Sequence, residues 1–178
     1  MNTQQKTRWL TVNAMGVALF VVLSLCLQVP IFSNYYICLG YLVMAIFCYS
    51  LGSASGAIVG ALGTILYCMA INGLRGMPGW TLGNIVIALI LGVVFKKCSE
   101  KEVLGKADYF IMLVAILFAT ALGILGVKSF TEVVLYAQPF WFRVTTNVYA
   151  FIADVVTLWL SIPLCIKLRP QISRIVNT

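Results

Sequence analysis

Residues 41–66 read YLVMAIFCYSLGSASGAIVGALGTIL and contain two apolar runs joined by the turn-like segment LGSASG. The first run begins near residue 35, and the second continues to about residue 71. Apolar runs of roughly 20 residues are typical of helices that cross a bilayer. The stretch therefore predicts two membrane helices, 35–51 and 54–71, joined by a very short hairpin.

Glycine is frequent along this hairpin, at Gly40, Gly52, Gly56, Gly60 and Gly63. Gly56 and Gly60 form a small-xxx-small pair. This spacing lets two helices approach closely in lipid, where packing contacts replace the hydrophobic drive between helices. We interpret these glycines as internal packing positions rather than as a ligand site.

The composition excludes a soluble protein. Of the 178 residues, 62% are hydrophobic and 10% are charged, and the mean hydropathy is +1.02. So few charged residues cannot form a polar shell around a core of this length. The net charge of +7 does not indicate a nucleic-acid partner, because the basic residues lie between apolar runs rather than in a stripe. The sequence predicts an integral membrane protein in contact with the lipid bilayer.

The apolar runs and the breaks between them predict an all-α bundle of about six transmembrane helices, with residues 1–178 as a single domain. The expected spans are 9–30, 35–51, 54–71, 79–95, 109–127 and 141–167. The first run is longer than a signal-peptide core, and no small-residue cleavage site follows it. We therefore interpret it as a retained first helix.

The basic residues predict the orientation of the bundle. They gather in the segments 6–8, 96–106 and 167–174, which fall on one side of the membrane if the helices alternate in direction. Positive charge is retained on the cytoplasmic side. Both termini are therefore expected in the cytoplasm.

Several reaction classes are excluded by residue types that the sequence lacks. It contains no histidine, and its six cysteines form no CxxC pair. The usual zinc sites and the Ser/His and Cys/His catalytic arrangements are thereby removed. A GxxxxGK[ST] phosphate loop is also missing from the sequence. We expect no enzyme, no metal and no cofactor, so any ATP-driven step belongs to a partner.

Polar residues in the sixth run are the first candidates for a binding site, because polar groups are costly inside a membrane. Arg143, Asn147 and Asp154 lie at offsets of four and eleven residues, along one stripe of a helix. We predict that they line a cavity that opens outward. Two alternatives stay open: Arg143 can extend to the head groups, and Asp154 can form a structural hydrogen bond with a neighbouring helix.

The fourth run adds Trp80 and Asn84, four residues apart on one helical face. An aromatic plane beside an amide suits a flat heterocycle that forms hydrogen bonds, although Trp is also common in the interfacial belt of membrane proteins. Glu132 is a further candidate, in the segment KSFTEVVLYAQPFW at 128–141, which we expect to be an outer loop.

The order of these features resembles the substrate-binding S component of energy-coupling factor (ECF) transporters, over nearly the full chain. The resemblance rests on the basic N-terminus, the six spans, AMGVA at 14–18, the glycine-rich hairpin and PGWTLGNIVIALILGVVFKK at 78–97. It implies that Ala14 and Ala18 contact a coupling transmembrane subunit, which carries two ATPase subunits. It also implies that the first outer loop, with Asn34 and Tyr35, acts as a lid over the ligand.

The resemblance implies high-affinity capture of a vitamin or precursor from outside a bacterial cytoplasmic membrane, followed by inward delivery. Few polar groups of mixed sign beside many aromatic residues favour a small, flat, mostly neutral ring compound. GWTLGN at 79–84 and RVTTN at 143–147 are most similar to S components for pyridoxine or hydroxymethylpyrimidine, with riboflavin next. The alternative is a self-sufficient secondary transporter of a small organic solute.

Overall fold

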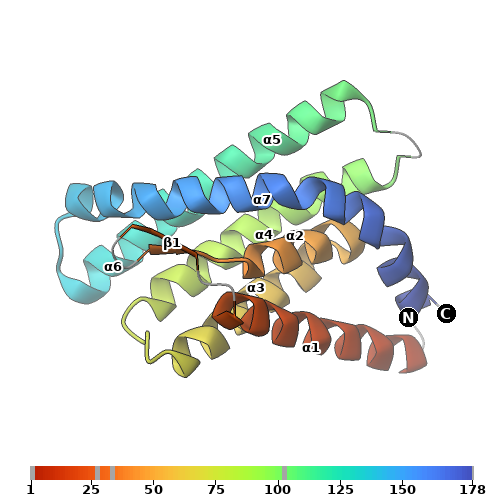
Figure 1. Cartoon of the computed structure of the whole chain (residues 1–178), viewed down its shortest axis with the longest axis horizontal. Helices are drawn as coiled ribbons and strands as arrows, with labels where there is room; N and C mark the ends of the chain where they lie inside the picture. The colour runs from red at the N-terminus through yellow and green to blue at the C-terminus, as the bar shows by residue number, and fades with distance from the viewer. Residues whose placement is uncertain (1–2, 27–28, 33–34, 102–103, 178) are drawn as a thin grey trace.

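The computed structural model describes residues 3–26, 29–32, 35–101 and 104–177, which form a helical bundle with one short strand pair (Figure 1). In chain order the elements are α1 (Thr3–Cys26), β1 (Val29–Phe32), β2 (Tyr35–Ile37), α2 (Gly40–Leu51), α3 (Ser53–Ala70), α4 (Met77–Ser99), α5 (Lys106–Thr120), the π-helix η1 (Ala121–Lys128), α6 (Ser129–Tyr136) and α7 (Phe140–Asn177).

Helix lengths agree with a membrane bundle. Five helical stretches are long and apolar enough to cross a membrane: Thr3–Cys26, Ser53–Ala70, Met77–Ser99, Lys106–Tyr136 and Phe140–Ile172. Helix α2 is a sixth apolar helix of 12 residues, which corresponds to about 18 Å of helix. The predicted all-α bundle of about six helices is confirmed.

Helix α2 lies at the centre of the bundle and packs against α1, α3, α4 and α7. Residues 43–50 are all buried, as expected for a helix that is apolar on every side. At its end the chain reverses into α3 through Gly52, whose φ of 93° is a conformation that favours glycine. The predicted short hairpin is confirmed, although its first helix begins five residues later than expected.

Other glycines allow the neighbouring helices to reach α2. A side chain at Gly60 of α3 would come within 2.6 Å of the Met44 sulfur, and one at Gly56 would collide with Cys48. On α1, a side chain at Gly16 would come within 2.5 Å of the Phe47 ring. The interpretation of Gly56 and Gly60 as internal packing positions is therefore confirmed.

The first outer connection differs from the prediction. Helix α1 ends at Cys26 rather than near residue 30, and α2 begins at Gly40 rather than near residue 35. Strands β1 and β2 occupy this segment as an antiparallel pair, with Val29 opposite Ile37. The segment is rich in β-branched and aromatic residues, which favour strands.

The predicted outer loop at 128–141 is wrong over most of its length. The helical path of α5 continues without a break through η1 and α6 to Tyr136. Ser129 donates a hydrogen bond to the Ile124 carbonyl at 3.3 Å, five residues back along the wider turns of the π-helix. Glu132 is therefore a helical residue and not a loop residue.

The last helix also extends beyond the predicted end near residue 167, because α7 continues to Asn177. Two prolines, Pro163 and Pro170, lie inside it, and proline removes a backbone hydrogen bond and bends a helix. Figure 1 shows the later part of α7 turning toward the beginning of α1. Leu168 and Ile172 pack against the core there, which explains why the helix does not stop.

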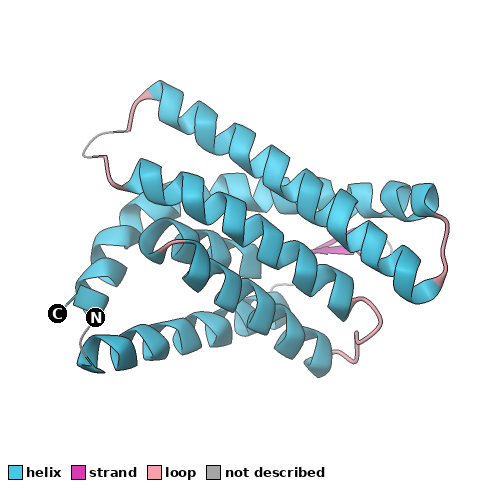
Figure 2. Ribbon diagram, turned by 180° about the vertical axis from the view of Figure 1, so that it is seen from behind, coloured by secondary structure: helices cyan, strands magenta, loops and turns pink. Residues whose placement is uncertain are grey.

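Figures 1 and 2 show that α1 begins and α7 ends at the same end of the bundle, where the connection between α4 and α5 also lies. The strand pair and α6 lie at the opposite end (Figure 1). The three basic segments therefore gather at one end, which the positive-inside rule assigns to the cytoplasm. The end with α6 and the strand pair is the outer end.

Substitution of Gly123 tests the contact between α4 and η1. A side chain at Gly123 would lie within 2.7 Å of the Gly83 carbonyl oxygen, a backbone atom that cannot move aside alone. We expect Gly123→Ala to lower the free energy of unfolding by about 1–3 kcal/mol, measured by denaturation in detergent. Gly126→Ala is the matched control in η1, because its nearest neighbour would be 3.7 Å away. Equal stability of the two variants would contradict the close approach.

Candidate binding site

Polar side chains from five helical elements meet in the interior toward the outer end of the bundle. They form two groups, the Glu132 cluster and the Tyr41 cluster. The Glu132 cluster consists of Ser129, Glu132, Arg143 and Asn147. The Tyr41 cluster consists of Tyr41, Thr64, Trp80, Asn84 and Asp154.

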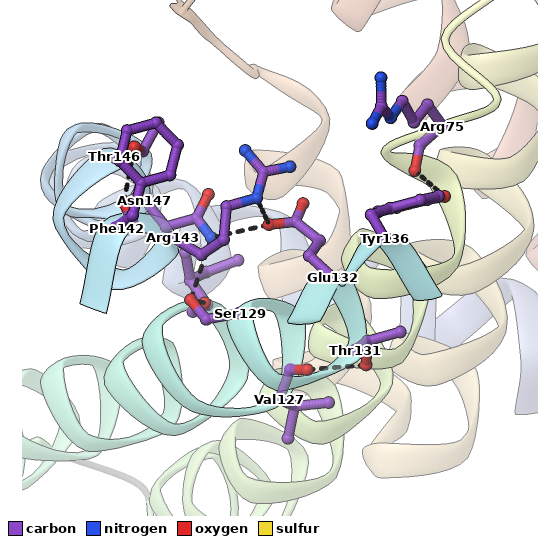
Figure 3. Close-up of polar contacts among 11 residues, drawn as sticks. Arg75, Val127, Ser129, Thr131, Glu132, Tyr136, Phe142, Arg143, Thr146 and Asn147 are labelled. Atoms are coloured by element: carbon purple, nitrogen blue, oxygen red, sulfur yellow. Dashed lines mark hydrogen bonds and ion pairs between the residues drawn. The ribbon is translucent and has the colours of Figure 1, made fainter. Parts of the chain in front are cut away.

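The Glu132 cluster joins α6 to α7 (Figure 3). Glu132 is only 3% exposed, and its Oε2 lies 3.2 Å from Nε of Arg143. The Asn147 amide donates to the same oxygen at 3.1 Å and to the Ser129 hydroxyl at 3.0 Å. The buried carboxylate thus has a cation and a hydrogen-bond donor, which is what a buried charge requires.

Gly79 on α4 makes room for this arrangement. A side chain at this position would lie 3.1 Å from the Lys128 carbonyl oxygen and 3.4 Å from Cγ of Glu132. The absence of a side chain lets α4 pass close to the junction of η1 and α6. The local sequence therefore positions Glu132 between α4 and α7.

The loop after α3 is tied to the end of α6. The Tyr136 hydroxyl donates a hydrogen bond to the backbone carbonyl of Arg75, and the Arg75 guanidinium lies 5.0 Å from the centre of the Tyr136 ring (Figure 3). Cation–π contacts of this kind are favourable at about 0.5–1 kcal/mol when exposed. The loop between α3 and α4 is thereby held beside the Glu132 cluster.

The Tyr41 cluster is a chain of hydrogen bonds across α2, α3 and α4. The fully buried Tyr41 hydroxyl accepts from Nε1 of Trp80 at 2.8 Å and donates to Oδ1 of Asn84 at 2.7 Å. Asn84 in turn donates to the Thr64 hydroxyl at 2.6 Å, and Thr64 donates to the Gly60 carbonyl at 2.7 Å. Buried polar groups require such partners, and the chain fixes the orientation of both the indole and the amide.

Asp154 connects this cluster to α7. Its side chain is buried and lies within electrostatic range of Lys128 and of the Tyr41 hydroxyl. The single proton of the Tyr41 hydroxyl is donated to Asn84. A structural hydrogen bond from Asp154 to a neighbouring helix stays a prediction.

The structure brings six of the predicted ligand residues into these two clusters. Trp80 and Asn84 face Tyr41 together, as their spacing predicts. Figure 3 shows Arg143 and Asn147 reaching the same carboxylate from one side of α7. Arg143 is half-buried and forms an ion pair with Glu132, while its extension to the head groups stays an alternative. Contact of any of these residues with a ligand remains a prediction.

The other predicted residues lie elsewhere or are not described. Asn34 lies outside the described residues. Tyr35 begins β2, and the structure describes its backbone but not its side chain. Ala14 and Ala18 are exposed on α1, on the side opposite to the buried Gly16 and Phe20.

Sequence reasoning missed Tyr41, Thr64, Lys128 and Ser129. Tyr41 and Thr64 lie within apolar runs, where an isolated hydroxyl gives little signal in the sequence. The sequence does contain a signal that Lys128 and Ser129 are helical, because no proline occurs between residue 109 and Pro139. A long segment without proline favours continuation of the helix into α6.

Comparison with known proteins identifies the family. Residues 4–169 match the sequence model of the family described as "ECF-type riboflavin transporter, S component". A UPF0397 protein of Aliivibrio salmonicida is 31% identical over 147 residues, which cover 79% of this chain and 76% of that protein. A UPF0397 protein of Streptococcus thermophilus is 27% identical over 155 residues, which cover 85% and 83% of the two chains.

A solved structure shares the fold. The crystal structure of the S component for biotin from an ECF-type ABC transporter superposes with a TM-score of 0.70 at 19% identity, covering 96% of this chain and 95% of that chain. The helices of both chains thus follow the same path, and the matched family is one of transporter subunits rather than enzymes. The chain belongs to the ECF-type S components, the multi-pass membrane subunits that bind vitamins for ECF transporters.

Proposed function

We propose that this S component captures a small ring-containing vitamin or precursor from outside and delivers it inward when docked on an ATP-driven ECF module. Pyridoxine or hydroxymethylpyrimidine is favoured, and riboflavin is next. The observation that carries the proposal is the convergence of Trp80 and Asn84 with Glu132, Arg143 and Asp154 toward the outer end. An aromatic ring, amides and paired charges suit a flat ligand with both donors and acceptors.

The balance of charge supports a ligand that is neutral overall. Glu132 is paired with Arg143, and Asp154 interacts with Lys128, so two acids are offset by two bases. A polyanion would meet two buried carboxylates without an excess of cations. The family description names riboflavin, and the similar solved structure is an S component for biotin, which supports a vitamin as the class of ligand.

The exposed face of α1 supports docking on a coupling subunit. Ala14 and Ala18 are exposed, and the larger apolar residues Leu10, Met15 and Val22 are exposed beside them. Small side chains let a second membrane helix approach closely. We propose that this face contacts the coupling transmembrane subunit, that two ATPase subunits use the ATP, and that this chain needs no cofactor of its own.

The bacterial cytoplasmic membrane is the proposed location, because the similar UPF0397 proteins are from Aliivibrio, Vibrio and Streptococcus. A secondary transporter remains the alternative. Uptake that persists in cells without the coupling subunit and collapses with the ion gradient would favour that alternative. Uptake that requires the coupling subunit and its ATPases would support the S-component function.

Ligand capture is tested first by purification in detergent without added vitamin. We expect a stoichiometric ring compound to be released on denaturation and identified by mass spectrometry, because the proposed capture is of high affinity. The same compound should raise the thermal unfolding midpoint of the emptied protein. An empty protein that gains no thermal stability from any vitamin in a panel would contradict the proposal.

The Tyr41 cluster is tested by Tyr41→Phe. This change leaves Nε1 of Trp80 and Oδ1 of Asn84 without their partner, which should lower the free energy of unfolding by about 1–3 kcal/mol. Ligand affinity should fall as well, because both side chains lose their fixed orientation. Tyr109→Phe, at an exposed position on α5, is the matched control. Reduced stability with unchanged affinity would restrict the cluster to a structural role.

The docking face is tested by Ala14→Trp combined with Ala18→Trp. We expect uptake in cells to be lost while the purified protein still folds and binds ligand, because two indoles prevent close approach of a partner helix. The matched control is Val114→Trp with Phe118→Trp, at the same spacing on α5, which lies at the opposite edge of the bundle (Figure 1). Normal uptake by the α1 variant would exclude this face as the docking surface.

A further inference from the structure

The face that the fifth span turns toward the interior changes between α5 and α6. In α5, the fully buried residues Met112, Ile116 and Ala119 mark the face that packs into the bundle. Phe130 follows Met112 by 18 residues, which is about five turns of a regular α-helix, so an unbroken helix would direct it inward. Phe130 is instead 63% exposed. The inward face of α6 is therefore not the continuation of the inward face of α5.

Glu132 is displaced in the opposite sense. It follows Met112 by 20 residues, so an unbroken α-helix would place it about 200° away from Met112, facing out of the bundle. Its side chain is instead 3% exposed and meets Arg143 and Asn147 in the interior (Figure 3). A regular helix would thus leave a carboxylate on the outer face of a membrane span, which is unfavourable.

The π-helix η1 between α5 and α6 accounts for this change of face. Its hydrogen bonds reach five residues back, so its turn holds one residue more than an α-helical turn. One extra residue turns the helix that follows it back by about 100°. Phe130 then takes the angle of Ile111, which is 48% exposed. Glu132 takes the angle of Leu113, about 20° from the fully buried Thr120.

Gly126 is the residue of η1 that the helix can best spare. Gly123 makes the close contact of η1 with α4, and Ile124 is fully buried in the core. A side chain at Gly126 would meet only Leu122 at 3.7 Å and the Ala121 carbonyl oxygen at 4.0 Å, both in η1 itself. The contacts that hold η1 in the bundle thus belong to other residues.

We propose that η1 is a positioning element of the binding site, and that its one extra residue directs the Glu132 carboxylate to Arg143 and into the site. This inference rests on the proposed function and deepens it. π-helical turns are rare and occur frequently at functional sites, and the ion pair of Glu132 with Arg143 offsets the cost of this one. A residue without ligand contact thereby decides that the ligand meets a carboxylate rather than the Phe130 ring.

Deletion of Gly126 tests the inference without a ligand. The segment should become a regular α-helix with α6 in its present orientation, so the ligand-free protein should unfold at the same or a higher temperature in detergent. Glu132→Gln should then lower the unfolding temperature by the same amount in the deletion variant and in the full chain, because it breaks the same ion pair. Loss of this effect, or a deletion variant that does not fold, would overturn the inference.

Deletion of Leu117 is the matched control. Leu117 is 41% exposed on α5, a regular α-helix that has no extra residue. Its deletion should turn the buried residues on its two sides by about 100° relative to each other, and should lower the unfolding temperature markedly. Equal tolerance of the two deletions would overturn the inference, because the span would then absorb the loss of any residue.

The position of the carboxylate separates positioning from a general structural role of η1. Deletion of Gly126 is combined with the exchange Glu132→Val and Val133→Glu, and affinity for pyridoxine, hydroxymethylpyrimidine and riboflavin is measured by titration calorimetry. The deletion alone should keep the wild-type affinity, and the added exchange should weaken it about 10-fold or more, as expected for loss of a charged hydrogen bond. A deletion variant that binds only after the exchange would overturn the inference, because α6 would then have turned with the deletion.

Failure of the proposed function gives a different result. A wild-type protein that binds none of the three compounds and no other vitamin in a panel would contradict the proposed function. The unfolding temperatures of the Gly126 deletion with and without Glu132→Gln would still test the role of η1, because that measurement needs no ligand.

Discussion

The buried carboxylate of Glu132 is the constraint on which the outer end of the bundle depends. A charge inside a membrane protein must be neutralised and hydrogen-bonded, and Arg143 and Asn147 of α7 meet both requirements. Loss of one partner of a buried ion pair typically costs about 3–5 kcal/mol. The position of α6 against α7 is therefore fixed by this contact, and the positions of Lys128 and Ser129 follow from it.

Close backbone packing makes the polar interior possible. Gly79 and Gly83 bring α4 against η1 and α6, while Gly60 brings α3 against α2. These approaches let side chains of different helices reach one another across the bundle, so hydrogen bonds that would otherwise remain unmade are completed. Packing and polarity thus act together, because an amide such as Asn84 is tolerated in the interior only when Thr64 and Tyr41 are within reach.

The sequence predicts features that depend on local spacing. It does not predict features that depend on contacts between residues far apart in the chain. The reversal at Gly52 and the common face of Trp80 and Asn84 follow from residue type and helical period. The partner of Asn84 does not, because Tyr41 lies 43 residues away in an apolar run. The sequence predicts a loop around Glu132 because the fifth apolar run ends near residue 127, whereas the helical path continues to Tyr136 and the ion pair with Arg143 holds the carboxylate inside the bundle.

The buried charged and amide side chains of α7 lie in its outer part, which constrains the proposed inward delivery. Its outer part presents Arg143, Asn147 and Asp154 to the interior, whereas farther along it Leu158 and Ile162 join the buried apolar core. A polar ligand that enters from outside meets this core before it reaches the cytoplasm. Movement of the ligand past this core either exposes buried apolar surface or removes the polar contacts of the ligand, and both are unfavourable. The proposed inward delivery therefore requires that the bundle open or reorient at this core.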